Sequence, residues 1–515
     1  MVAGGYEPPD VQVAAGPGFL VEMVNLAERV WQTGSGAPRP VQTRDLAALF
    51  GTGGDVLTDP RVLFDAGSGR WFASISDVDT SDVLLAVSPG ADPTAAWSVS
   101  SFAARGCADQ PRLGIADSVV VLAADVYEDC ERQGSTTLGA ELWTVNKAQL
   151  LAGSTAPASM SFGPTNDYAS LAPVQSLSAT ATEYVVAVDD RVSRVVHLLA
   201  VDGVPPDAVQ LREVAAPEIR TLSRPPSAAQ PPSSGVRPPI ATNDNRILDS
   251  VWEDGHLWFS ANARCTPAGD VLIRTCARVV ELDTATRTVA WDTDIGVAGA
   301  HVFYPAIRPD RDGNLVIVAG ESGLKVLPEL VAFGRTPDGA LTNPVVIVQS
   351  AGTYRGDRYG DYFGAARDPL TPNVVWVAGE AGTDIPSGLG WTTALASVVV
   401  TAAGETPPAV AGVAPPGVRA ARTFARVGGS VRLAYRALDD GDSVRTIATV
   451  ENAKQKLVFR TATPRGAFRA NQRYFVLWPA KKASGKFTFC VASVSVSGLQ
   501  SPQSCATITL PRAGS

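Results

Sequence analysis

The amino-acid sequence predicts an all-β protein in which a β-propeller precedes a small β-sandwich. Three observations lead to this prediction. A hairpin-like unit recurs along the chain. Gly (47) and Pro (38) are abundant, and no long amphipathic helix is evident. A Pro/Gly-rich stretch also precedes a change in the sign of the net charge. Internal similarity at a period of several short strands is typical of propellers, whose small sheets bury their faces by packing around a ring.

The recurring unit is clearest at Asp59–Ser76 (DPRVLFDAGSGRWFASIS). An apolar strand over 61–65, a Gly/Ser turn over 66–69 and an aromatic-led strand over 70–76 predict a β-hairpin. Related units follow Gln110 and surround Ile247, Tyr304 and Gly364, with weaker units near the start and near Pro173. Seven blades over 1–402 result if both weaker units count, and six blades are the alternative.

A Pro/Gly-rich linker is expected over 403–417, followed by a second domain over 418–515. The second domain contains about six short strand patterns of immunoglobulin-like sandwich type. Its charge is opposite to that of the propeller, with a net +12 over 413–515 against −20 over 1–412. A basic module of this kind suits an anionic surface, a polyanionic glycan or the acidic propeller, and a basic face without a dedicated partner is the alternative.

The six cysteines fall into three close pairs: Cys107 with Cys130, Cys265 with Cys276, and Cys490 with Cys505. None has CxxC spacing, so the pattern predicts three disulfides and an exported protein, with buried free thiols as the alternative. No apolar run approaches the ~20 residues of a membrane helix. An extracellular location and the absence of a nucleic-acid motif argue against a nucleic-acid partner.

Several segments together resemble a broad group of secreted bacterial proteins predicted to be sialidase-like β-propellers. The segments are PPDVQVAAGP, DPRVLFDAGSGRWF, LLAVSPGADPTAAW, FYPAIRPDRDGN and GDYFGAARDPLTPNVVWVAGE. The resemblance covers nearly all of 1–402 and implies a propeller fold and export. Sialidases carry Asp boxes of the form S-x-D-x-G-x-x-W, of which FDAGSGRWF is a distorted relative. Their Arg-Ile-Pro signature is missing, so sialidase roles are not transferred to residues here.

Polar residues at the start of each blade are the candidate site, because the innermost strands line the channel and ligands usually sit at one mouth of it. The candidate catalytic residues are Asp10, Asp59, Asp109, Asp361, Tyr304 and Tyr362. The candidate ligand-binding residues, for a carboxylate or sulfate, are Arg61, Arg112, Asn245 and Arg246. The alternative is structural: such residues also tie neighbouring blades together through exposed backbone groups.

A possible cation site is the turn Asp310–Asn314, where Asp310, Asp312 and Asn314 place oxygen atoms at alternate positions, as calcium loops do. No acidic residue stands at the closing position, so a hairpin turn is the simpler interpretation. No other cofactor is expected.

Two functions from different classes follow. One is an extracellular binding or adhesion protein that recognises a glycan or other surface ligand at the channel mouth. The alternative is a sialidase-like glycan-active enzyme, a hydrolase or lyase. Two carboxyl groups in an open pocket would favour the enzyme, and a plugged mouth with paired charges would favour the binding protein.

Overall fold

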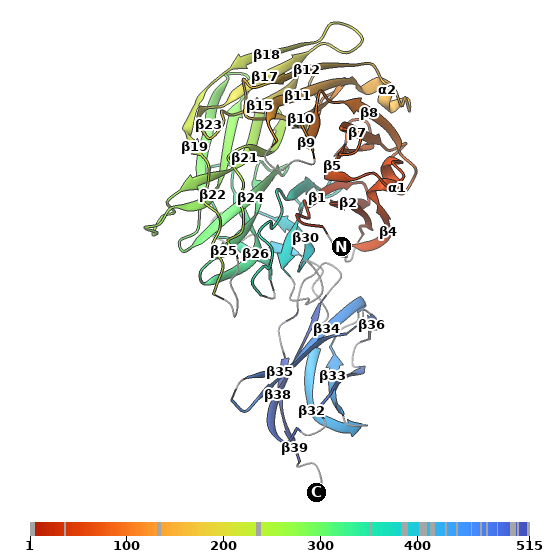
Figure 1. Cartoon of the computed structure of the whole chain (residues 1–515), viewed down its shortest axis with the longest axis vertical. Coiled ribbons are helices and arrows are strands. Elements are labelled where there is room, and N and C mark those ends of the chain that lie inside the picture. Colours follow the sequence, from red (N-terminus) through yellow and green to blue (C-terminus); the bar gives the residue numbers. More distant parts are fainter. Residues whose placement is uncertain are drawn as a thin grey trace. The chain divides into compact units, whose positions relative to one another are not determined.

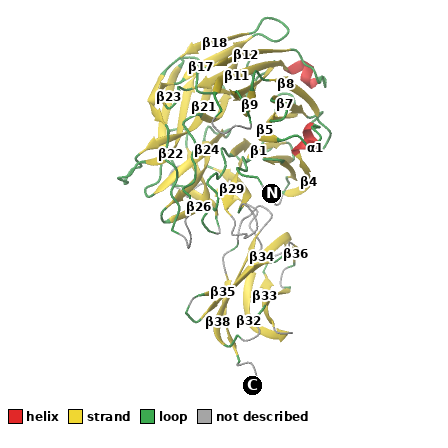
Figure 2. Cartoon of the chain, viewed as in Figure 1, coloured by secondary structure: helices red, strands yellow, loops and turns green. Residues whose placement is uncertain are grey.

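The structure is a computed structural model of the chain. It describes residues 6–34, 38–130, 135–232, 238–350, 352–382, 390–400, 409–411, 418–427, 430–438, 441–454, 456–463, 466–469, 472–480, 483–494, 501 and 504–511. Two compact units are present, Val2–Val410 and Ala411–Ser515. Strands dominate both, and Figure 2 shows helix only in short segments of the larger unit.

Four-stranded antiparallel sheets succeed one another along the larger unit. The first sheet contains β1 (Gln12–Gly16), β2 (Phe19–Val24), β3 (Ala27–Gln32) and β4 (Arg39–Asp45). The second contains β5 (Leu57–Asp65), β6 (Arg70–Asp77), β7 (Asp82–Val87) and β8 (Ser98–Ala103). The third contains β9 (Cys107–Ile115), β10 (Val119–Tyr127), β11 (Thr137–Asn146) and β12 (Ser159–Thr165). Short helices α1 (Leu46–Phe50) and α2 (Lys147–Leu151) follow β4 and β11.

The later sheets repeat this order. The next two contain β13 (Leu171–Pro173), β15 (Glu183–Ala187), β17 (His197–Asp202) and β18 (Gln210–Ala215), and then β20 (Ile247–Glu253), β21 (His256–Cys265), β22 (Arg274–Asp283) and β23 (Thr288–Ile295). Another contains β24 (Ala300–Pro309), β25 (Leu315–Gly323), β26 (Val326–Arg335) and β27 (Val345–Gln349). The last contains β28 (Gly364–Arg367), β29 (Val375–Gly382), β30 (Trp391–Val399) and β31 (Ala409–Ala411). Outside this pattern, β16 (Val192–Val195) pairs with β19 (Glu218–Ser223), and β14 (Gln175–Ser176) pairs in parallel with both β9 and β20.

The first strands of these sheets form a closed ring. Contacts run from β1 to β5, β9, β13, β20, β24 and β28, and β28 in turn contacts β1. Figure 1 shows β1, β5, β9 and β24 toward the middle of this unit and later strands such as β4, β18 and β23 farther out. This arrangement is that of a β-propeller. A ring suits these sheets because each exposes two apolar faces that only neighbouring sheets can cover.

The hairpin expected at Asp59–Ser76 is confirmed. β5 and β6 pair with Asp65 opposite Arg70, and the turn between them ends at Gly69, whose φ of 67° suits a residue without a Cβ. Phe64 and Trp71 face each other across the pair with ring centroids 4.9 Å apart. Trp71 is fully buried in a core that also takes side chains from β2 and β7. The apolar side chains that alternate along the strands of one sheet therefore pack against those of the next sheet in the ring.

The stretch predicted as a linker, 403–417, lies mostly outside the described residues. Its described part, Ala409–Ala411, is β31, which joins the sheet of β28–β30. This short Ala/Val segment lies at the edge of that sheet. The Pro/Ser-rich loop beyond Leu222 is irregular where it is described, apart from a bridge between Ala228 and Ile240.

The C-terminal unit contains two sheets. One holds β32 (Val418–Val427), β33 (Ser430–Ala437) and β37 (Arg473–Trp478). The other holds β35 (Leu457–Ala462), β34 (Gly441–Asn452), β38 (Gly485–Val494) and β39 (Ser504–Leu510), with β36 (Gly466–Phe468) paired to β34. Leu433 and Val476 of the first sheet share one apolar core with Val450, Phe489 and Val491 of the second.

The three predicted disulfides are all present: Cys107–Cys130, Cys265–Cys276 and Cys490–Cys505. Cys265–Cys276 joins β21 to β22 across a hairpin, and Cys490–Cys505 joins two paired residues of β38 and β39. Among the described residues, no helix has the length and apolar character needed to cross a membrane.

Candidate functional site

Four residues that lie within the first strands, or just before one, have a backbone in the left-handed region. The φ angles are 50° at Asp10, 59° at Asp59, 47° at Gln110 and 55° at Tyr304. The last three each precede a proline, and the strand register shifts at each of them. A bulge re-aims the side chain that it carries, and left-handed backbone is costly for a residue with a Cβ. Repeated strained positions of this kind are typical of functional sites.

Two asparagines hold these strand starts. Asn25 follows β2; its Oδ1 accepts the backbone N–H of Asp59 (2.9 Å), and its Nδ2 donates to Oδ2 of Asp10 (2.7 Å). Asn262 on β21 accepts the backbone N–H of Tyr304 (2.7 Å) and donates to the carbonyl of Thr242 (2.9 Å). An amide suits both places because it offers a donor and an acceptor at once. One side chain therefore ties two neighbouring sheets together at the level of the candidate site.

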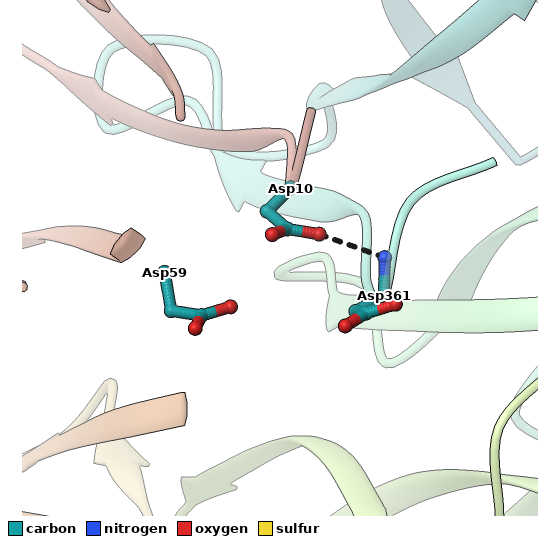
Figure 3. Close-up of side chains that lie close together, drawn as sticks. All are labelled: Asp10, Asp59 and Asp361. Carbon is teal, nitrogen blue, oxygen red and sulfur yellow. Dashed lines mark hydrogen bonds between the residues drawn. The ribbon is translucent and has the colours of Figure 1, made fainter. Parts of the chain in front are cut away.

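Three carboxyl groups meet at this end of the ring. Figure 3 shows Asp10, Asp59 and Asp361, and one oxygen of each lies within 4.8 Å of the others. Oδ1 of Asp10 accepts the backbone N–H of Asp361 at 2.8 Å. The three residues are only 1%, 5% and 2% exposed. They stand at the starts of the first, second and last sheets, so the cluster forms where the two ends of the ring meet.

Electrostatic repulsion and burial both act on this cluster. Burial raises the pKa of Asp10 well above its usual value, and the charges of Asp361 and Asp59 raise it further. Burial and Asp361 also raise the pKa of Asp59, against the opposing effect of Arg61 and Arg358. The Arg358 guanidinium pairs with Asp361. The two arginines offset only part of these effects, so Asp10 and Asp59 keep raised pKa values.

Asp109 is the acid of the predicted set that is partly exposed to solvent. Burial and the nearby Asp59 raise its pKa to about 7, while Arg246 acts in the opposite direction. On the strand pair β9–β10 it stands opposite Asp125. A carboxyl group with a pKa close to neutral pH is suited to give and take protons in catalysis.

Arg246 and Asn245, two of the predicted ligand-binding residues, both bond to groups within the chain. Every guanidinium nitrogen of Arg246 donates within the chain, to both oxygens of Asp244, to Asp125 (2.7 Å) and to Gln110 (2.9 Å). These bonds fix Arg246 at the rim near Asp109. Asn245 is directed toward the carbonyl of Asp189 (3.4 Å), beside the sheet of β13 and β15.

The two predicted catalytic tyrosines have structural roles. The hydroxyl of Tyr304 donates to the carbonyl of Ala241 (2.9 Å), and that of Tyr362 donates to the carbonyl of Pro60 (3.0 Å). Burial raises the pKa of both hydroxyls well above the usual value. Neither ring is more than 1% exposed. A neutral, buried phenol whose proton is already donated is a poor nucleophile, so the catalytic assignment of Tyr304 and Tyr362 is not supported.

The predicted calcium turn is a hairpin turn between β24 and β25. Oδ1 of Asp310 accepts the backbone N–H groups of Asp312 (2.9 Å) and Asn314 (2.9 Å), and Oδ2 accepts Nδ2 of Asn314 (2.9 Å). The turn satisfies itself without a cation, so calcium at Asp310, Asp312 and Asn314 is not supported. Among the described residues, the group whose carboxylates lie close enough to share a cation is Asp10, Asp59 and Asp361.

Two cavities lie along the ring axis on the far side of this cluster. One of about 450 Å³ is lined by residues near the ends of β1, β5, β9, β24 and β28, with Lys147 and Arg311 at its wall. A smaller one of about 50 Å³ shares Val62, Leu63 and Arg308 with it. The predicted ligand-binding residues Arg61 and Arg112 line the smaller cavity. The three predicted arginines therefore lie in two places: Arg246 is at the rim, and Arg61 and Arg112 are inside the channel.

Sequence reasoning missed several residues of this region. Gln110 was detectable, because it precedes a proline as Asp59 and Tyr304 do. Arg358, Asn25 and Asn243 lie in loops or at strand ends without a repeated pattern. Asn243 nevertheless donates to Oδ1 of Asp361 at 2.8 Å. Their roles depend on which loops the closed ring brings together, and the local sequence carries no signal for that.

No family model matches this sequence, and the search of curated proteins finds no match. Among solved structures, the chain is similar to prolyl oligopeptidase B from Galerina marginata, with a TM-score of 0.41 and 10% identity; 84% of this chain and 57% of that protein are covered. The chain is also similar to the Bombyx mori GH32 beta-fructofuranosidase, with a TM-score of 0.36 and 8% identity; 89% of this chain and 87% of that protein are covered. For phage phi92 endosialidase the TM-score is 0.37 and the identity 9%, and 98% of this chain and 86% of that protein are covered. Because every TM-score is below 0.5, the fold and the site rest on the contacts described above.

Proposed function

We propose that the protein is a glycan-active enzyme whose reaction centre is the carboxyl cluster at the start of the first strands. The observation that carries this proposal is the convergence of acids from four sheets. Asp10, Asp59 and Asp361 are buried together, and Asp109 beside them is partly exposed with a pKa of about 7. Acids in close proximity but in different environments are the arrangement that glycoside hydrolysis uses.

In the proposed reaction Asp109 is the proton donor. Its position at the solvent edge lets it reach a glycosidic oxygen, and its raised pKa keeps part of the population protonated at neutral pH. Asp361 is the second carboxyl group of the proposal. Its oxygens accept from Arg358 and Asn243, which hold the carboxyl group in one orientation. A carboxylate held in this way stabilises a positive transition state or activates water.

The test is hydrolysis by the purified full-length protein. A panel of acidic and neutral polysaccharides is incubated at pH 4–8, and released reducing ends are measured. We expect release from at least one polymer, and a loss of roughly 100-fold or more in kcat for Asp109→Asn. The control is Asp312→Asn, an exposed acid in the β24–β25 turn, which should keep wild-type activity.

A binding protein is the second candidate, favoured by the coverage of the buried acids. The backbone of Ala241 bonds to Asp357, and Tyr304 bonds to Ala241, so two loops are tied together over the cluster. If glycans are retained by the immobilised protein but never cleaved, and Asp109→Asn retains them equally well, the enzyme proposal is wrong and the binding function stands.

Finer features of the architecture belong to the same proposal. We infer a seven-bladed propeller, an immunoglobulin-like C-terminal sandwich and an extracellular location in which the disulfides persist.

The basic C-terminal unit would hold the protein at an anionic glycan or surface. Retention of the full chain on a heparin column at low salt, lost when Arg432, Arg436 and Arg473 of one sheet are replaced by Gln, would support this tethering. Unchanged elution would contradict it.

A further inference from the structure

The small cavity in the channel is lined by an unusual concentration of buried positive charge. Three arginines come from three different sheets: Arg61 on β5, Arg112 on β9 and Arg308 on β24. They are 8%, 5% and 6% exposed. Gln12, Gln175 and Asp249 also line the cavity, whose volume is about 50 Å³. Arginine is seldom buried to this degree unless its charge and its N–H groups are matched.

These guanidinium groups are incompletely paired in the described chain. Nε of Arg61, Nε and Nη1 of Arg112, and Nη1 of Arg308 make no hydrogen bond. Two of the groups form long ion pairs: Asp125 lies 3.5 Å from Nη1 of Arg112, and Asp249 lies 3.5 Å from Nη2 of Arg308. The hydrogen bonds that the groups do make are to carbonyls or an amide, such as that from Nε of Arg308 to Ala365 (2.9 Å).

The neighbouring acids offset only part of this charge. Asp125 is shared with Arg246, which it contacts at the shorter distance of 2.7 Å. Asp249 uses its Oδ2 to accept the backbone N–H of Ile307 (2.9 Å). Arg61 stacks on the ring of Tyr362, with its guanidinium carbon 3.5 Å from the ring centroid, which supplies only part of a counter-charge. Burial lowers the pKa of Arg112 and of Arg308. Asp125 and Asp249 act against this effect, and in each case a neighbouring arginine adds to it.

We propose that this cavity is a binding site for a small inorganic anion, chloride being the occupant that fits, held between the guanidinium groups of Arg61, Arg112 and Arg308. Several guanidinium groups around one cavity provide the excess positive charge and the N–H donors that anion sites use. The cavity holds a monatomic ion with a water or two, since one water occupies about 30 Å³ in the liquid. The wider cavity shares Val62, Leu63 and Arg308 with it.

The ion would join three sheets of the ring at its axis. Because Arg61, Arg112 and Arg308 belong to strands far apart in the sequence, an anion between them replaces mutual repulsion by three attractive contacts. This inference does not depend on the proposed glycan activity. A protein that merely binds, or that lacks any activity, would carry the same site.

The first test is structural and uses the full wild-type chain. Crystals grown in sodium bromide in place of sodium chloride should give one anomalous peak in the channel, within hydrogen-bonding reach of the three guanidinium groups. Density for water alone, without an anomalous signal, overturns the proposal. A crystal from sulfate that shows sulfate in the cavity, where bromide is not retained, overturns the choice of a monatomic anion.

The second test measures thermal stability at constant ionic strength, with sodium gluconate replacing sodium chloride. The Tm of the larger unit should rise by about 3 °C as chloride increases to 100 times its Kd. Arg308→Met should abolish this dependence. The control is Arg278→Gln: Arg278 is equally buried but pairs with Asp292 and Asp294, so its loss should lower the Tm and leave the chloride dependence intact. A wild-type Tm that does not change with chloride concentration contradicts the proposal, even if Arg308→Met does not fold.

Discussion

Asp109 shows how one residue couples the candidate chemistry to stability. Its pKa is raised to about 7 in the folded state, whereas an unfolded aspartate titrates near 3.9. The folded protein therefore binds more protons than the unfolded chain between about pH 4 and pH 7. The stability that this group contributes is complete below pH 4 and is lost as the pH rises through 7.

We expect Asp109→Asn to flatten the fall in the free energy of unfolding between pH 5 and pH 7.5. At pH 7.5 the variant should be more stable than the wild type, by roughly 1–3 kcal/mol, because the amide imitates the protonated acid. Urea unfolding at half-unit pH steps measures the free energy of unfolding of both proteins.

Three other acids, Glu183, Glu321 and Glu380, also have raised pKa values. The difference between the pH profiles of the wild type and Asp109→Asn therefore isolates Asp109. Asp207→Asn, in an exposed turn, should follow the wild-type profile; parallel profiles for all three proteins would show that Asp109 is not perturbed.

At the scale of elements, the bulged strand starts depend on the asparagines that hold them. Replacing Asn25 by Ala leaves the backbone N–H of Asp59 and Oδ2 of Asp10 without their partner, and both groups are buried. We expect a loss of about 1–3 kcal/mol in the free energy of unfolding, and a similar loss for Asn262→Ala at Tyr304. Asn166→Ala removes only an exposed bond to Leu138 and should change stability by less than about 0.5 kcal/mol. Equal urea midpoints for all three variants would mean that the asparagines do not secure the bulges.

Elements also show what the sequence could predict. The Asp59–Ser76 hairpin and the three disulfides follow from local patterns, namely turn residues, alternation and cysteine spacing. The positions of Asp10, Asp59 and Asp361 at strand starts follow from the repeat as well. Arg308 was not identified because it lies near the end of its strand, a position that reaches the channel only once the sheets are arranged around the axis. The pairing of Arg246 could not be predicted either, because its partner Asp125 lies on β10, far away in the sequence.

At the scale of the whole larger unit, stability depends on the seam between its first and last sheets. Hydrogen bonds between described residues cross it. Nε1 of Trp391 donates to the carbonyl of Tyr6 (2.8 Å), the backbone N–H of Arg358 to Oε1 of Glu7 (2.9 Å), the backbone N–H of Asp361 to Asp10 (2.8 Å), and Nε2 of Gln12 to the carbonyl of Phe363 (2.8 Å). In a closed ring every sheet has two neighbours, and the two sheets beside a seam each lose one of them when that seam opens.

A chain that begins at Val11 removes three of these hydrogen bonds. The bond at Asp361 is buried, the bond at Trp391 is partly buried and the bond at Arg358 is exposed. We expect the calorimetric transition of the larger unit to fall by about 5 °C, since a lost bond costs about 1–3 kcal/mol where it is buried and less where it is exposed. Trp391→Phe removes only the bond to Tyr6 and should lower the same transition by a few degrees. The transition of the C-terminal unit should stay in place in both variants, because that unit has its own core, and it serves as the internal reference. If the truncated chain melts at the wild-type temperature, residues before Val11 do not close the ring, and the carboxyl cluster that spans the seam would have to be held together by its loops alone.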